Sequence, residues 1–198
     1  MKAPRLFLSC AVSLGLCSGL LLTIERASPQ EPQSTGASVR RQEEAALLRP
    51  EDTRTLDGLI AALYDVISGP KGQDRDWNRF RNLFHPEGRL VPISPRNSGA
   101  AAALVLSPDG YIQRFGSALK SQGFFEKEVD RRTEIFHRLA NVWSTYEGRS
   151  DPADATPIVK GINSIQACFD GHRWWLLHVI WCPEDAAHPL PEAYDRHR

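Results

Sequence analysis

The chain has 198 residues, and its 24 Lys and Arg balance its 24 Asp and Glu, so the formal net charge is zero. Surfaces that bind nucleic acid or anionic membranes carry an excess of positive charge, because they must neutralise the phosphates. The basic residues are also interleaved with acidic ones, as in residues 126–132. The composition therefore argues against nucleic acid as a partner, and we expect membrane contact only through an uncleaved N-terminus.

The N-terminus has the layout of a secretory signal. Lys2 and Arg5 are followed by an uncharged, mostly apolar run from Leu6 to Ile24. We interpret residues 1–27 as a cleaved signal peptide. An uncleaved membrane anchor is the second interpretation, since the run approaches the roughly 18–20 residues that span a bilayer. A lipid anchor at Cys10 or Cys17 is the third, although Leu16 precedes Cys17 where a small residue is expected. All three place the rest of the chain outside the cytoplasm, in the periplasm, secreted or anchored to the membrane.

Composition divides the remaining chain into three parts. Residues 28–50 are rich in Ser, Pro, Gln and charged residues, and such a segment cannot bury enough surface to offset the entropy of ordering it. We predict a flexible linker there, one domain over residues 51–185, and a flexible tail over residues 186–198.

Three helices are expected in the first part of the domain. Apolar residues three and four apart predict a helix that begins at Asp52 or Thr53 and ends at Gly69. A shorter helix follows over residues 77–84. The third begins at Ser107, with Pro at the first helical position and an acid in the first turn.

Strands dominate the rest of the sequence. Residues 89–93 and 100–106 are predicted strands, and beyond residue 123 the pattern predicts two hairpins, over residues 124–147 and 157–182. Asp170-Gly171 is a favoured two-residue hairpin turn. Helices followed by antiparallel strands predict an α+β fold, with the helices packed on one face of a mostly antiparallel sheet.

The predicted turn fixes which residues of the last hairpin share a face, because side chains alternate along a strand. His178 then lies opposite Asn163, and both point toward the helices together with Trp174. A polar pair on an otherwise apolar face is where a ligand could be held. A His–Asn hydrogen bond without any function is an equally weighted alternative.

The opposite face of the last strand carries Trp175 and Trp181. A strand that is apolar on both sides is expected to be covered on both sides. We therefore expect a homodimer through the sheet face that holds these two indoles.

Two stretches and the order of elements resemble the nuclear transport factor 2-like superfamily, which includes ketosteroid isomerase-like and SnoaL-like proteins. Residues 76–86 (DWNRFRNLFHP) are similar to the second helix of the family and the turn into its first strand. Residues 170–176 (DGHRWWL) are similar to its last hairpin. Residues 144–147 and 161–166 resemble exported bacterial members without an assigned activity. The resemblance covers residues 53–183 and implies a strongly curved sheet that forms a cup or cone.

The resemblance does not settle the activity, because the superfamily hosts isomerases, dehydratases, cyclases, carriers and interaction domains. Ketosteroid isomerase-like enzymes carry a general-base Asp on the first strand after the second helix, whereas the similar stretch here, residues 90–93, has no carboxylate. This departure argues against steroid isomerisation. Tyr64 lies near the position of the oxyanion-binding Tyr of those enzymes; the alternative is a Tyr that flanks the core.

His178 is the predicted catalytic base, with Asn163 orienting it or the substrate. Tyr146, Trp143, Trp174 and Tyr64 are further predicted pocket residues. The charged residues on the strand before them are expected at the surface, namely Glu128, Arg131 and Glu134. The six His residues have no metal-ligand spacing and no cofactor motif is present, so no metal and no cofactor are predicted.

Two functions of different classes follow. The first is a domain that binds a small apolar ligand, with cofactor-free lyase or isomerase activity as an extension. The second is a non-catalytic dimeric interaction protein whose cup is filled by its own side chains. An open cavity favours the first function and a packed interior favours the second; the sequence leaves open whether the protein is an enzyme.

Overall fold

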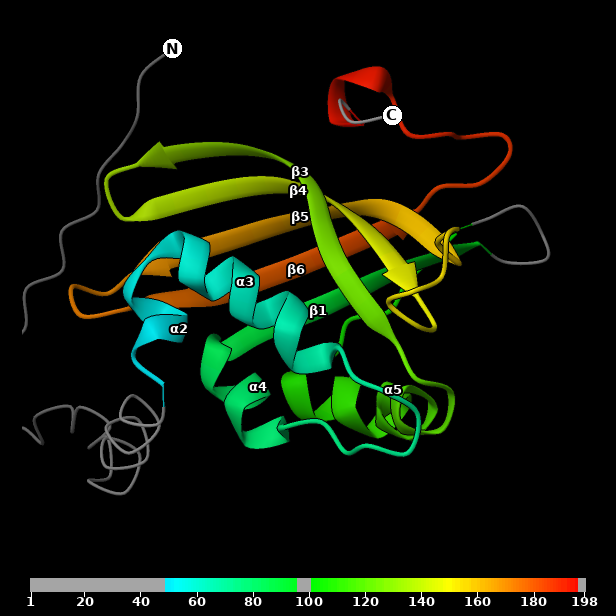
Figure 1. Ribbon diagram of the computed structural model, residues 1–198. Coiled ribbons are helices and arrows are strands. Elements are labelled where there is room, and N and C mark those ends of the chain that lie inside the picture. The colour runs from blue at the N-terminus through cyan, green and yellow to red at the C-terminus, as the bar shows by residue number, and fades with distance from the viewer. Residues whose placement is uncertain (1–48, 96–100, 196–198) are drawn as a thin grey trace, which may run out of the picture. The chain divides into compact units, whose positions relative to one another are not determined.

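The computed structural model describes residues 49–95 and 101–195 (Figure 1). The predicted signal segment, residues 1–27, and nearly all of the predicted linker, residues 28–50, lie outside this part of the chain. Among the described residues, no helix has both the length and the apolar character that crossing a bilayer requires.

The helices of the described residues are α2 (Glu51–Arg54), α3 (Leu56–Ile67), α4 (Trp77–Leu83) and α5 (Pro108–Gln122). The first predicted helix is divided at Thr55, whose hydroxyl accepts from the Gly58 N–H and so begins α3. Asp76 caps α4 and Ser107 caps α5 in the same way. The second and third predicted helices are confirmed.

The strands are β1 (Phe84–Pro95), β2 (Ala101–Ala103), β3 (Phe125–Phe136), β4 (Leu139–Arg149), β5 (Val159–Phe169) and β6 (Trp174–Pro183). They form one sheet in the order β2-β1-β6-β5-β4-β3, in which β1 and β6 are parallel and every other neighbouring pair is antiparallel. The predicted α+β class with a mostly antiparallel sheet is confirmed.

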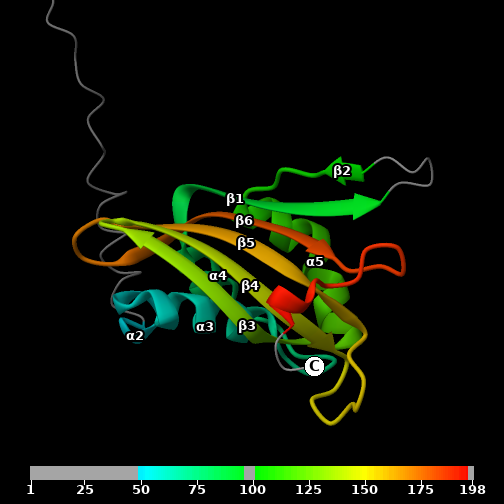
Figure 2. The ribbon, with the colours of Figure 1, turned by 90° about the horizontal axis from the view of Figure 1, so that it is seen from above.

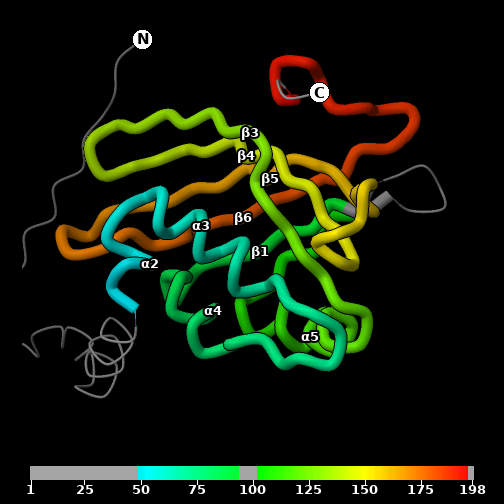
Figure 3. The backbone as a smooth tube through the Cα atoms, viewed as in Figure 1, coloured from blue at the N-terminus to red at the C-terminus, as the bar shows by residue number. Residues whose placement is uncertain are grey.

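The sheet bends around the helices, which all cover the same face (Figures 1 and 3). The core forms between this inner face and α3 and α4. Its fully buried members include Leu59, Ile60, Phe80, Leu83, Val142, Ile165 and Leu176. Seen from above, β3 and β4 cross over α3, and α5 lies beneath the strands at the end of the sheet opposite α2 (Figure 2).

The hairpin of β5 and β6 contains an extra residue that reverses the facing of the second half of β6. The Asp170 N–H donates to the Arg173 carbonyl oxygen at 3.1 Å, so the turn lies one residue later than predicted. Trp174 pairs with Phe169, and the register then shifts by one at Leu177. An extra residue in one strand turns every later side chain to the other face.

The prediction that His178 and Asn163 share a face is therefore wrong. His178 pairs with Gln166 and is exposed on the outer face of the sheet. Asn163 pairs with Trp181, so this indole takes the inward place that His178 was predicted to hold.

The same extra residue separates the two indoles of the predicted dimer surface. Trp181 turns inward and Trp175 stays on the outer face, where it is only 8% exposed. The Arg173 guanidinium lies 3.8 Å from the centroid of the Trp175 ring, and the indole N–H donates to Asp170 at 2.6 Å. The predicted surface with both indoles does not form.

After β6 the chain returns across the outer face, on the side away from the helices (Figure 1). A short 3₁₀ helix, η1 (Glu192–Tyr194), ends this segment. The Thr145 hydroxyl donates to the Tyr194 carbonyl oxygen at 2.7 Å, and the Tyr194 ring packs against Trp143 at 5.8 Å between centroids. Leu190 is buried. Residues 186–195, predicted as part of a flexible tail, thus pack against the sheet.

Candidate functional site

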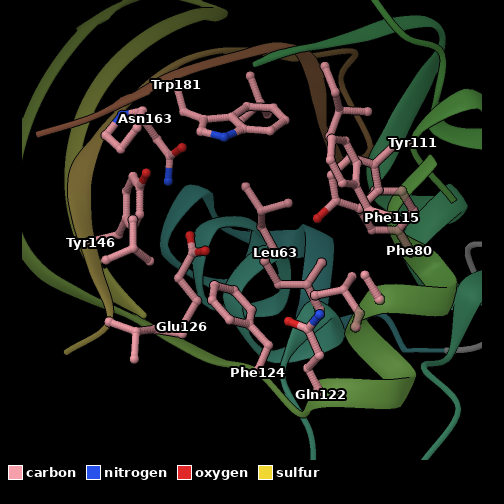
Figure 4. Close-up of a pocket in the computed structure, with 18 of the residues that line it drawn as sticks. Leu63, Phe80, Tyr111, Phe115, Gln122, Phe124, Glu126, Tyr146, Asn163 and Trp181 are labelled. Atoms are coloured by element: carbon pink, nitrogen blue, oxygen red, sulfur yellow. The ribbon is translucent and has the colours of Figure 1, made fainter. Parts of the chain in front are cut away.

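A cavity of about 280 Å³ lies between the inner face of the sheet and the helices (Figure 4). Its wall is mostly apolar and consists of Leu63, Ile67, Phe80, Leu90, Tyr111, Phe115, Leu119, Phe124, Val159, Val179 and Trp181. At about 30 Å³ for each water molecule, it has room for roughly nine. A pocket of this size suits a ligand smaller than an ordinary drug molecule.

Three exposed side chains mark the end at which the cavity meets solvent. Ala118 and Gln122 come from the second half of α5, and Ile158 lies just before β5. Ile158 is 62% exposed. The entrance therefore presents an apolar side chain to solvent.

Glu126, the second residue of β3, is the charged residue of the cavity wall. Figure 4 shows its carboxylate directed into the cavity, on the same side as Asn163 and Tyr146. Within residues 49–95 and 101–195 it forms no salt bridge. Burial raises the pKa of this carboxyl to about 7, and a hydrogen bond from Asn163 only partly opposes the rise. Glu126 therefore exchanges a proton near neutral pH.

A chain of buried hydrogen bonds leads away from Asn163 behind the cavity wall. The Asn163 amide donates to the Tyr64 hydroxyl oxygen at 2.9 Å, and the Tyr64 and Ser144 hydroxyls lie 2.6 Å apart. Ser144 donates to Glu128, which also accepts from Arg131 at 2.6 and 2.8 Å. These five side chains form the Asn163–Arg131 network.

The ion pair of Glu128 and Arg131 determines which group donates in each hydrogen bond of this network. A carboxylate held by a guanidinium only accepts hydrogen bonds, so Ser144 must donate to Glu128. Tyr64 must then donate to Ser144, and the Tyr64 oxygen is left to accept from the Asn163 N–H. The network consequently holds the Asn163 amide in one orientation, with its nitrogen toward Tyr64 and Glu126.

Two phenols of the cavity wall remain available to a ligand. Tyr111 and Tyr146 both have raised pKa values, caused first by burial and then by the charge of Glu126, so they stay neutral and can donate. Neither hydroxyl donates to a residue of the part of the chain that the structure describes. A Cβ on Gly161 would come within 2.6 Å of the Tyr146 hydroxyl oxygen, so glycine is needed there for the close approach.

The structure brings together some of the predicted site residues. Asn163 and Tyr146 line the cavity, and Tyr64 lies directly behind it, hydrogen-bonded to Asn163. Three of the six predicted residues therefore lie at the cavity or directly behind it.

The other three predicted residues lie elsewhere. His178 is on the outer face, for the register reason given above. Trp143 is 40% exposed and packs against Tyr194 on that same face. Trp174 packs against Phe169 at 5.6 Å between centroids, near the turn of the hairpin, and does not line the cavity.

The sequence interpretation missed Glu126, because it took residues 126–132 for a solvated strand edge. Glu128 and Arg131 were also expected at the surface, yet each side chain is only 22% exposed. Glu134 is exposed as predicted. The position of Glu126 on the inner face follows from the pairing of β3 with β4, in which it lies opposite Gly148, and the sequence alone carries no signal for this pairing.

Within the described residues, no group of three or more His, Cys, Asp or Glu is arranged to hold a metal ion. The polar groups of the cavity wall are instead a carboxyl, an amide and two phenols. These groups can bind and orient a small molecule and can move a proton.

No model of a known protein family matches the chain, and no curated protein matches it. Solved structures do match. One is a protein of unknown function with a cystatin-like fold from Nostoc punctiforme, at 14% identity and a TM-score of 0.51, covering 71% of this chain and 94% of that one.

Two further matches have TM-scores below 0.5. A nuclear transport factor 2-like protein of unknown function from Silicibacter pomeroyi has 14% identity and a TM-score of 0.44, covering 65% of this chain and 92% of that one. A type 2 hexachlorocyclohexane dehydrochlorinase has 9% identity and a TM-score of 0.43, covering 76% of this chain and 96% of that one. At such identities the likeness concerns the fold alone. The predicted cone fold is confirmed as a fold by the likeness to the cystatin-like protein from Nostoc punctiforme.

Proposed function

We propose that this protein is a small-molecule-binding domain whose cavity holds a compact, mostly apolar ligand, with Glu126 as the polar anchor. The observation that carries the proposal is the Glu126 carboxyl directed into a cavity of about 280 Å³ whose wall is otherwise mostly apolar (Figure 4). Buried carboxyl groups in native proteins normally have partners. Asn163 is the partner that the described residues give to Glu126, and a ligand with one polar group would supply a further one and cover the apolar wall.

The alternative of an interaction protein with a filled cup has less support. The side chains of the protein leave the cavity open. The Tyr111 and Tyr146 hydroxyls make no hydrogen bond to the described residues. A filled cup would need neither these hydroxyls nor Glu126 for packing.

A thermal-shift screen tests ligand binding. The screen uses small apolar molecules with one amine, alcohol, ketone or acid group, and compares the wild type with Glu126→Gln and Val179→Phe. We expect at least one class to raise the unfolding temperature of the wild type. The shift should fall in Glu126→Gln for a ligand that pairs with the carboxylate, and in Val179→Phe, which fills the cavity, for every ligand.

Glu134→Gln is the matched control, because Glu134 lies on the same strand with its side chain 71% exposed. If every molecule leaves the wild type unchanged, or if Val179→Phe keeps the full shift, the proposed ligand cavity is wrong.

Acid–base catalysis is the second candidate function, favoured by the Glu126 pKa near 7 and the two free phenols. An ionised Glu126 would take a proton from a C–H next to a carbonyl, and the electron pair would move onto the carbonyl oxygen, where Tyr111 or Tyr146 donates. Return of the proton at another carbon gives an isomerase. Loss of a leaving group from the adjacent carbon, with later release of the proton from Glu126, gives a lyase.

Proton exchange in deuterated water tests this candidate without a known substrate. Small ketones are incubated with the protein, and loss of their α-protons is followed by NMR. We expect Glu126→Gln to slow exchange by about 100-fold or more and Tyr146→Phe to slow it less. Exchange at the same rate with and without wild-type protein would exclude this chemistry for the compounds tested.

We also propose that the domain acts outside the cytoplasm, which rests on the signal-like layout of residues 1–27. Fractionation of a bacterial host with mass spectrometry of the N-terminus tests it. Export with loss of the first residues supports a cleaved signal, export at full mass supports an anchor, and retention in the cytoplasm contradicts both.

A further inference from the structure

Two carboxylates two residues apart on β3 differ in their counter-charge. Glu128 is held by Arg131 at 2.6 Å, and Arg131 also pairs with Asp57. Within residues 49–95 and 101–195, no Lys, Arg or His lines the cavity, and Lys127, Arg131 and Arg149 border a neighbouring hollow on the other side of Glu126. On the cavity side, an ionised Glu126 therefore has no counter-charge from the described residues.

The rest of the cavity wall is aromatic. Phe80, Tyr111, Phe115, Phe124, Tyr146 and Trp181 contribute six rings. Tyr111 lies 5.2 Å from Phe80, 5.0 Å from Phe115 and 6.1 Å from Trp181 between ring centroids, so these rings form a continuous surface. Figure 4 shows this surface across the cavity from Glu126.

We infer that the cavity selects an organic ammonium ion, with the charged nitrogen at Glu126 and its hydrocarbon part against the aromatic wall. This inference rests on the proposed ligand cavity and names the class of its ligand. The carboxylate supplies the counter-charge, and ring faces attract a cation within about 6 Å. A neutral ligand gains neither of these interactions and keeps only apolar contact and a hydrogen bond, and an anionic ligand is repelled by the ionised carboxylate.

The size of the cavity restricts the ammonium ion further. Space for roughly nine water molecules admits one six-membered ring with a short side chain but is too small for a peptide. A polyamine would leave additional charges against the apolar wall.

Binding should strengthen as pH rises through 7, because the ammonium ion pairs only with the ionised form of Glu126. The groups that face Glu126 from the surrounding elements are Tyr64 on α3, Tyr111 on α5, Tyr146 on β4 and Asn163 on β5. The three phenols have raised pKa values and Asn163 does not titrate, while Glu128 on the same strand is paired with Arg131. Glu126 is thus the group that changes charge in this range.

Three probes with one hydrocarbon skeleton test the inference on the full-length chain: cyclohexylmethylammonium, cyclohexylmethanol and cyclohexanecarboxylate. Dissociation constants are measured by calorimetry at about pH 8. We expect the ammonium ion to bind about tenfold or more tightly than the alcohol, and the carboxylate to bind weakest. In Glu126→Gln the ammonium preference should disappear while the alcohol keeps its affinity, and Glu134→Gln should behave as the wild type.

A pH comparison on the wild type keeps the test decisive if Glu126→Gln fails to fold. The affinity for the ammonium ion should fall about tenfold between about pH 8 and about pH 5.5, whereas that for the alcohol should stay constant. Equal or tighter binding of the alcohol, or an ammonium preference that persists in Glu126→Gln, would overturn the inference and leave the proposed cavity standing. Failure of all three probes to bind would count against both.

Discussion

Glu126 and Glu128 show how strongly the surroundings of one side chain decide its chemistry. Both lie on β3 and point to the same side of the sheet, opposite Gly148 and Tyr146. Glu128 forms an ion pair with Arg131 and does not line the cavity. Glu126 extends into the cavity, where burial raises its pKa to about 7. Side chains of the same type thus form an ion pair in one place and a buried, proton-exchanging group in the other, which is the proposed anchor of a ligand.

The raised pKa of Glu126 predicts that the contribution of this residue to stability falls as pH rises. The folded state keeps this carboxyl protonated up to about pH 7, while the unfolded chain releases the proton near 4.5. At this residue the folded state therefore holds more protons between these values, and its contribution to the free energy of unfolding falls with pH until it levels above 7. A glutamine at position 126 does not titrate. The free energy of unfolding of Glu126→Gln should therefore rise relative to that of the wild type between about pH 4.5 and 8, by at most about 3 kcal/mol.

Urea unfolding of both proteins at several pH values measures this difference. Access of water to the cavity would reduce the size of the gain. A constant difference between the two proteins across the range would show that Glu126 titrates normally.

The variants Tyr64→Phe and Tyr146→Phe together test the buried Asn163–Arg131 network, because only Tyr64 belongs to it. Tyr64→Phe leaves the Asn163 N–H and the Ser144 hydroxyl oxygen without their partner, so it should cost about 1–3 kcal/mol. Tyr146→Phe removes a hydroxyl that makes no hydrogen bond to the described residues and should cost less than about 0.5 kcal/mol. Chemical denaturation gives both values, and equal costs would contradict the network.

At the scale of elements, Arg75 joins α3, the loop after it and α5. Its buried guanidinium donates to the carbonyl oxygens of Ile67, Gly69, Gln73 and Leu119 at 2.7–3.0 Å. This contact holds the end of α5 against the loop, and that end carries the lining residues near the cavity entrance.

Arg75→Leu should therefore destabilise the fold by about 3 kcal/mol or more, since several buried acceptors lose their donor at once. Amide hydrogen exchange should also quicken in the last turns of α5. Arg114→Leu is the control on the same helix, because Arg114 is exposed, and its change should stay within about 0.5 kcal/mol. Unaltered exchange in α5 after Arg75→Leu would rule out the joining role.

The helices and strands were predictable because each depends on a local pattern. Leu59, Leu63 and Ile67 follow helical spacing, and Ser107-Pro108-Asp109 begins a helix by its own chemistry. The extra residue at Leu177 has no such signal: residues 174–182 are apolar without a break, so nothing in the sequence shows where the alternation changes phase. The site prediction failed at His178 for this reason.

At the scale of the whole molecule, the segment after β6 covers part of the outer face of the sheet. Leu190 is buried, Thr145 is 1% exposed beneath Tyr194, and Lys160 lies 3.8 Å from Asp195. The Pro residues and scattered charges of this segment predicted a tail, because they give no periodic pattern. Its order comes from contacts with β4 and β5 that are distant in sequence.

A chain that ends at Asp185 should therefore lose about 1–3 kcal/mol of stability, of which burial of Leu190 accounts for most. A chain that ends at Asp195 serves as the control and should unfold like the full-length protein. Urea denaturation of the three chains separates the outcomes, and equal midpoints would mean that the segment contributes nothing to stability.

The extra residue at Leu177 has a consequence for comparing this protein with others. In a relative whose last strand lacks it, an ungapped alignment would match His178 to a position that faces the ligand and Trp181 to one that faces solvent. Correspondence in this strand should therefore be established by superposing backbones, or by placing a one-residue gap at 177, before any residue is transferred or redesigned between homologues.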